Sequence, residues 1–138
     1  MKPVFADTSY YLALVNRTDP RHERAFELAE GLLGRVFVTE YVLVELGSAL
    51  SSGSDRLVYL DLLEDLQSDE SITIIPASES LFRHGVALFA ERPDKKWSLV
   101  DCISFIVMKQ RRLQEALTTD HHFVQAGFHA LLREAGQR

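Results

Sequence analysis

The sequence predicts an α/β fold: a three-layer α/β/α sandwich around a central, mostly parallel sheet of four to five strands. Short apolar, β-branched runs alternate with longer segments whose apolar residues recur at helical spacing. Strands separated by helices form the βαβ pattern of a parallel sheet. No internal repeat, linker or low-complexity stretch interrupts this pattern. We therefore expect residues 1–138 to form a single domain.

The composition is that of an ordinary globular protein, with 46% hydrophobic and 25% charged residues. No apolar run approaches the roughly 20 residues that a membrane helix needs, and the N-terminus lacks the features of a secretion signal. The single cysteine, Cys102, excludes an internal disulfide framework and fits a reducing compartment. We expect a cytoplasmic protein that has no membrane partner.

The acidic residues that give the net charge of −5 are unevenly distributed. Six of them lie between residues 54 and 70, where Arg56 is the one basic residue. The six are Asp55, Asp61, Glu64, Asp65, Asp69 and Glu70. Because the rest of the chain is far less acidic, the net charge does not exclude a nucleic-acid substrate.

The first half of the chain opens with a buried strand that stops abruptly at Asp7-Thr8-Ser9. Asp19 before Pro20 is a helix start, because proline suits the first helical turn. The Ser51 to Ser54 break separates two helices that we expect to form a hairpin. The predicted elements are a strand ending at Ala6, helices over 8–15 and 21–33, a strand over 36–39, and helices over 40–50 and 55–66.

The second half contains a helix that starts at Ser98 and is apolar almost all round, and we expect it to be buried in the middle of the fold. An exposed basic loop, Arg92 to Lys96, leads into it. The other predicted elements are a strand over 72–75, a helix over 78–89, a strand over 115–119, a short helix from Asp120, and a last weak strand around 128–132.

Three acids stand where helices begin, and each has an ordinary explanation as a helix cap. Asp7 and Asp120 follow strands directly, and Asp101 lies three residues after Ser98, in a variant of the capping box. Considered one at a time, these residues are explained as well by capping as by a functional role.

Glu45 is harder to explain by local structure. It lies in a helical stretch that is apolar on every side, and no Lys or Arg is within one turn. Burying an unpaired carboxylate costs several kcal/mol, so Glu45 needs a cation, a hydrogen-bond network or a raised pKa. An external cation is the simplest partner.

In a parallel sheet Asp7, Asp101 and Asp120 can point with Glu45 into one crevice at the carboxyl ends of the strands. Four acids without basic partners would repel one another unless a divalent metal lies between them. Oxygen ligands favour Mg²⁺ or Mn²⁺. Zinc is disfavoured, because His121 and His122 are adjacent and more typical of surface residues or substrate contacts.

These residues and their neighbours resemble the PIN-domain ribonucleases over essentially the full length, most of all the small single-domain members, including VapC-type toxins. The matching stretches are Asp7-Thr8-Ser9, Glu45, residues 97–105 (WSLVDCISF) and residues 117–123 (LTTDHHF). The resemblance implies that Asp7, Glu45, Asp101 and Asp120 are the catalytic ligands of one or two Mg²⁺ or Mn²⁺ ions that hydrolyse RNA. It implies a further polar contact from Ser9, with Thr119 a weaker candidate.

Substrate and partner contacts follow from the same resemblance. Arg92, Lys95 and Lys96 are the first candidates for RNA binding, because their loop leads into the helix of Asp101. Trp97 is a candidate for stacking on a base, although a core position explains it better; Arg17, Arg21 and Arg24 fit a solvated helix face equally well. The family further implies a homodimer and, for a toxin, a cognate antitoxin. Residues 40–66 offer an apolar surface for such an interface, although ordinary packing onto the sheet explains that surface equally well.

Other functions remain open at this point. An RNA-processing PIN nuclease without an antitoxin and a non-catalytic RNA-binding or interaction domain are both compatible with the sequence. A phosphohydrolase using Asp7 as nucleophile lacks the second aspartate two residues on, where Ser9 stands, and leaves Glu45 without a role. A phospho-receiver domain would need a second acid beside the strand-end acid and a lysine on a late strand, and Thr118-Thr119-Asp120 offers no such lysine.

Overall fold

A computed structural model describes residues 2–133 and confirms the predicted α/β fold. Its five strands form one sheet in the order β3-β2-β1-β4-β5, and every pairing is parallel. The strands are β1 (Val4–Ala6), β2 (Val36–Thr39), β3 (Ile72–Ile75), β4 (Glu115–Leu117) and β5 (His129–Ala130). The helices are α1 (Thr8–Val15), α2 (His22–Gly31), α3 (Glu40–Ala49), α4 (Asp55–Ser68), α5 (Glu79–Glu91), α6 (Leu99–Gln110) and α7 (His121–Gln125), with a 3-10 turn η1 (Leu131–Arg133).

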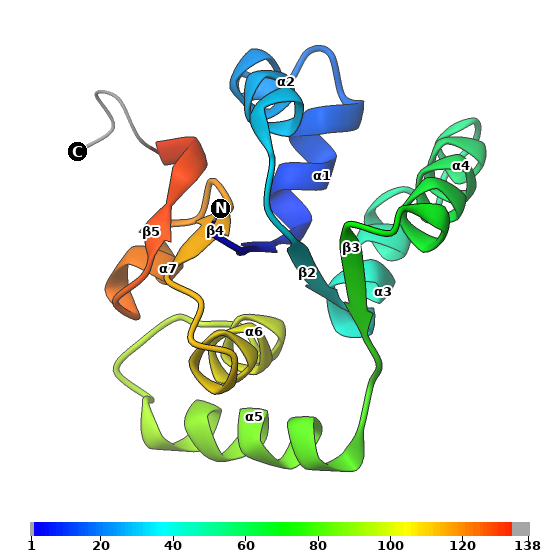
Figure 1. Cartoon of the computed structure of the whole chain (residues 1–138). Helices are drawn as coiled ribbons and strands as arrows, with labels where there is room; N and C mark the ends of the chain where they lie inside the picture. The colour runs from blue at the N-terminus through cyan, green and yellow to red at the C-terminus, as the bar shows by residue number, and fades with distance from the viewer. Residues whose placement is uncertain (1, 134–138) are drawn as a thin grey trace.

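The helices cover the sheet from both sides (Figure 1). Helices α1 and α2 pack together on one side, while α5 and α6 pack together on the other. The hairpin of α3 and α4 stands beyond the β3 edge of the sheet, and α3 contacts α1. None of the described helices is long and apolar enough to cross a membrane.

The order of the strands places a topological switch point between β1 and β4. From β1 the chain steps outward to β2 and β3, then returns to β4 on the other side of β1. Ligands of open α/β sheets bind outside the carboxyl ends of the strands at such a point. The Asp7 N–H donates to the Leu117 carbonyl at 3.1 Å, which carries the pairing of β1 with β4 one residue past β1. The sheet thus brings Asp7 beside residues 118–120.

A cluster of aromatic rings underlies this end of the sheet. Phe105 on α6 packs edge-on against Phe123 of α7 at 4.9 Å and against Trp97 at 5.0 Å between ring centroids. Phe123 in turn lies 6.3 Å from Phe5 of β1. All four rings are buried, and such pairs add to the free energy gained by apolar burial. The cluster therefore holds β1, α6 and α7 together, and with them the neighbouring acids Asp7, Asp101 and Asp120.

The predicted boundaries are right for most elements and are corrected in three: α2, β4 and β5. Helix α2 begins at His22, because the Asp19 side chain accepts from the Arg21 N–H at 2.8 Å in a turn before the helix. It ends at Gly31, since Leu32 is already extended toward β2. Strand β4 stops at Leu117, short of the predicted 119, and β5 is only two residues long before η1 begins.

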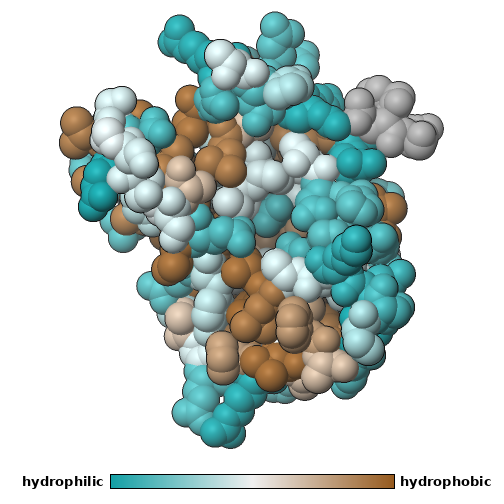
Figure 2. Space-filling model, turned by 180° about the vertical axis from the view of Figure 1, so that it is seen from behind, coloured by the Kyte–Doolittle hydropathy of each residue, from teal (hydrophilic) through white to brown (hydrophobic). Residues whose placement is uncertain are grey.

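Helix α4 buries less of its apolar face than its sequence pattern predicts. Leu66 lies in the core, but Leu57 is 67% exposed and Leu60 is 55% exposed. Val44 of α3 is 68% exposed. Hydrophobic side chains accordingly lie at the surface, among hydrophilic ones, on the lobe at the left of Figure 2, where this hairpin projects.

Candidate metal centre

Asp7 is 5% exposed and occupies the N-cap position of α1, yet its side chain makes no capping hydrogen bond. Instead, the Thr118 hydroxyl donates to Asp7 Oδ2 at 2.8 Å, and Ser9 Oγ lies 3.2 Å from the same oxygen. The capping explanation is therefore wrong for Asp7. Its carboxylate is held by hydroxyl groups at the carboxyl ends of β1 and β4.

Ser9 and Thr118 connect the two strand ends. Their hydroxyl oxygens lie 3.1 Å apart, Ser9 Oγ accepts from the Thr119 N–H at 2.9 Å, and Thr118 Oγ1 accepts from the Asp120 N–H at 3.0 Å. Thr118 is fully buried. The sequence interpretation missed Thr118 and considered Thr119 instead, because it placed both residues in the strand and had no register to tell which one faces Asp7.

Glu45 lies half-buried on α3, as expected. Its Oε1 accepts from the Thr8 hydroxyl at 2.5 Å, and Thr8 is the first residue of α1. A hydroxyl group thus connects Glu45 to the residue next to Asp7 without neutralising the charge of either acid.

For Asp101 and Asp120 the capping explanation is correct. Ser98 and Asp101 form a complete capping box at the start of α6, with both hydrogen bonds at 3.0 Å. Asp120 caps α7 by accepting from the His122 N–H at 2.9 Å. A carboxylate has two oxygens and about four lone-pair sites, so Asp101 and Asp120 can each bind a further ligand while they cap their helices.

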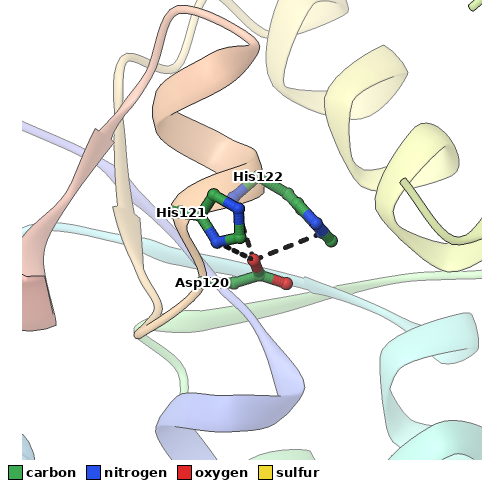
Figure 3. Close-up of side chains that lie close together, drawn as sticks. All are labelled: Asp120, His121 and His122. Carbon is green, nitrogen blue, oxygen red and sulfur yellow. Dashed lines mark hydrogen bonds and ion pairs between the residues drawn. The ribbon is translucent and has the colours of Figure 1, made fainter. Parts of the chain in front are cut away.

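Two histidines also reach the site, which the sequence interpretation had placed at the surface or against substrate. His122 Nδ1 lies 3.0 Å from Asp101 Oδ2 and 3.3 Å from Asp120 Oδ1, and its side chain is 19% exposed. His121 Nδ1 lies 3.7 Å from Asp120 Oδ1, and its side chain is 57% exposed. Figure 3 shows both rings turned toward the carboxylate of Asp120. The surface prediction is therefore wrong for His122.

The charges of the four acids act on one another. Burial, together with the neighbouring charges of Asp101 and Glu45, raises the pKa of Asp7 to about 6, although the Thr118 hydrogen bond opposes the rise. Burial and the charge of Asp120 likewise raise the pKa of Asp101. Within residues 2–133 no Lys or Arg forms an ion pair with any of the four. Such a set fits a divalent cation bound through oxygen.

The predicted RNA-binding residues are arranged in two groups. Lys95 and Lys96 line a hollow of about 410 Å³ together with Asp94, His121, His122 and Gln125, so they lie on the same hollow as the two histidines. Arg92 instead forms an ion pair with Asp94 at 2.9 Å and lies over the Trp97 ring at 5.2 Å.

Trp97 itself is 6% exposed and donates from Nε1 to Gln125 Oε1 at 3.0 Å. Stacking of Trp97 on a base is not supported, because Phe105 and Arg92 cover the ring.

Known proteins resemble this chain over most of its length. The family model described as PIN domain matches residues 4–129. The 23S rRNA-specific endonuclease VapC20 of Mycobacterium tuberculosis is 30% identical over 135 residues, which cover 91% of this chain and 95% of that protein.

Two solved structures share the fold. The crystal structure of M. tuberculosis VapC20, described as a sarcin-ricin loop cleaving toxin, superposes with a TM-score of 0.83 at 25% identity, covering 91% of this chain and 95% of the other. FitAcB from Neisseria gonorrhoeae superposes with a TM-score of 0.66 at 19% identity, covering 92% and 94%. The second likeness concerns the fold alone.

Proposed function

This chain belongs to the PIN-domain family, and we propose that it is a metal-dependent endoribonuclease that acts as the toxin of a toxin-antitoxin pair. One observation supports the proposal: the charges of Asp101 and Glu45 act on Asp7, that of Asp120 acts on Asp101, and none of the four acids has a Lys or Arg ion-pair partner among the described residues. A bound Mg²⁺ or Mn²⁺ would lower the pKa of a water ligand and neutralise the phosphate of the substrate.

The residues of the chain supply position and charge. Asp7, Glu45, Asp101 and Asp120 would hold one or two cations, while the hydroxyls of Ser9 and Thr118 keep Asp7 in a single orientation. Lys95 and Lys96, which line the hollow beside His121 and His122, would supply positive charge to an RNA phosphate that approaches the acids. No nucleophilic side chain is required, because water attacks the phosphodiester.

The relatives suggest which RNA to test first. VapC20 is named as specific for 23S rRNA, and its solved structure is described as that of a toxin that cleaves the sarcin-ricin loop. We take an RNA hairpin with that loop sequence as the first substrate, beside unstructured RNA.

Partners and location belong to the same proposal. We propose a homodimer, which the exposed Val44, Leu57 and Leu60 on the α3–α4 hairpin support. We further propose a cognate antitoxin and a cytoplasmic location. An RNA-processing role without an antitoxin is the alternative, and an adjacent gene for a small DNA-binding protein would favour the toxin.

The decisive experiment compares the purified wild type with Asp7→Asn on labelled RNA. We expect cleavage with Mn²⁺ or Mg²⁺, none with a chelator, and a loss of at least about 100-fold in the variant, since removing a metal ligand removes the catalyst. Glu30→Gln, which changes an exposed acid of α2, is the control and should retain activity. Cleavage that persists in the chelator would refute the metal mechanism, and metal binding without cleavage would favour the non-catalytic alternative.

A further inference from the structure

His122 reaches the site, but the proposed function does not use its contacts. It introduces a nitrogen donor among carboxylates, 3.0 Å from Asp101 Oδ2 and 3.3 Å from Asp120 Oδ1. We propose that His122 Nδ1 is a direct ligand of the metal held by Asp101 and Asp120, and that it makes the site prefer Mn²⁺ to Mg²⁺. This inference rests on the proposed metal dependence and goes beyond it.

The separations of these three atoms fit a shared metal. Neighbouring ligands of an octahedral ion with bonds of about 2.1 Å lie about 3 Å apart. The Nδ1 atom of His122 is at that separation from one oxygen of each aspartate. An ion could therefore be placed between the three atoms with little change in the side chains.

The position of the His122 ring is also constrained. The backbone N–H of His122 donates to Asp120 Oδ1 at 2.9 Å, which fixes the residue in the first turn of α7. Its side chain is 19% exposed. Phe123, the next residue, is anchored in the aromatic cluster. A histidine fixed in this way contributes a ligand at a small cost in side-chain entropy.

The proton on the imidazole can move to suit either state. Without metal, Nδ1–H donates to the carboxylates; with metal, a neutral ring protonated at Nε2 leaves the Nδ1 lone pair free to bind. Imidazole suits transition metals, whereas Mg²⁺ prefers oxygen ligands and retains its water. One nitrogen ligand is thus expected to raise the affinity for Mn²⁺ more than that for Mg²⁺.

His121 provides the contrast within the same helix. Its Nδ1 lies farther from the acids than that of His122, 3.7 Å from Asp120 Oδ1, and its side chain is 57% exposed. His121→Ala is therefore the matched control for His122→Ala. His122→Asn is a second variant, which keeps a polar side chain in the first turn of α7 in case the alanine variant folds poorly.

In the first measurement, the full-length protein is loaded with Mn²⁺ and its electron spin echo envelope modulation is recorded, which detects nitrogen bound to the metal. In the second, calorimetric titrations measure the affinities for Mn²⁺ and for Mg²⁺. We expect modulation from a directly bound nitrogen in the wild type and in His121→Ala, and none in either His122 variant. We also expect His122→Ala to lose about tenfold in Mn²⁺ affinity and clearly less in Mg²⁺ affinity. Bound Mn²⁺ without nitrogen modulation, or modulation that is lost in His121→Ala instead, would overturn the assignment.

The RNA assay separates this inference from the proposed function. Nitrogen-coordinated Mn²⁺ without RNA cleavage would uphold the ligand and refute the nuclease. RNA cleavage by a protein whose bound Mn²⁺ has oxygen ligands alone would uphold the nuclease and refute His122 as a ligand.

Discussion

At the scale of single residues, Asp7 combines a buried position with a carboxyl group that has no cationic partner among the described residues. Its pKa rises from 3.8 to about 6 because burial disfavours the charged form. The folded protein therefore binds a proton more tightly than the unfolded chain does. In the metal-free protein, the contribution of Asp7 to stability is present below pH 4 and is lost as the pH rises to about 6.

We predict that Asp7→Asn stabilises the metal-free protein at pH 7 by up to about 3 kcal/mol and has little effect at pH 4. Urea unfolding of both proteins in a chelator at several pH values measures this difference. The comparison cancels the titration of all groups that the two proteins share. Unfolding free energies that stay parallel across this pH range would contradict the prediction.

Thr118 offers a test of how Asp7 is positioned. Its hydroxyl donates to Asp7 Oδ2 and thereby lowers the pKa of that carboxyl. Thr118→Val removes the hydrogen bond at nearly constant volume, so the pKa of Asp7 should rise and Mn²⁺ binding should begin at a higher pH. Thr118→Ser, which keeps the hydroxyl, should bind Mn²⁺ with the wild-type pH profile. Identical profiles for wild type and Thr118→Val would show that the hydroxyl does not act on Asp7.

At the scale of secondary-structure elements, the position of α6 depends on close contact with α5. A Cβ atom built on Gly85 would lie 2.3 Å from Ile103 Cγ1, and Ile103 is buried. We predict that Gly85→Ala forces the helices apart and costs about 1–3 kcal/mol in unfolding free energy. Gly31→Ala, where no atom lies within 4 Å of the added carbon, should leave stability nearly unchanged.

Thermal and urea unfolding measure both glycine variants. Because α6 carries Asp101, Gly85→Ala should also weaken Mn²⁺ binding, whereas Gly31→Ala should not. A Gly85→Ala protein as stable as the wild type would show that α5 and α6 adapt freely to the added methyl group.

At the scale of the whole molecule, a chain with a formal charge of −5 has to attract a polyanion. Lys95 and Lys96 line the same hollow as His121 and His122, and we propose that they contact the RNA there. We predict that the double variant Lys95→Gln/Lys96→Gln binds RNA more weakly. The slope of log affinity against log salt concentration should become shallower, by the equivalent of up to two phosphate contacts.

Filter binding at several salt concentrations, with Asp7→Asn as the background that prevents cleavage, measures this effect. Lys109→Gln, on the exposed far end of α6, is the control for a change in net charge alone. An equal loss of affinity in the control would assign the effect to overall charge.

The sequence by itself predicted the α/β class and the parallel sheet, which the structure confirms, and it selected the four acids as the candidate site. Its local patterns suffice for this, because apolar runs, helical periodicity and an unpaired glutamate in an apolar helix are each visible within a few residues. Even the true caps, Asp101 and Asp120, follow from neighbours within three residues.

Only the tertiary structure decided which residues surround the acids. Thr118 faces Asp7 because β4 lies beside β1 in this register, and His122 reaches Asp101 because α6 and α7 share the aromatic cluster. The Trp97 ring is buried because it packs against Phe105 in the same cluster. Contacts between segments up to 111 residues apart depend on how strands pair and helices rotate, which no local pattern specifies.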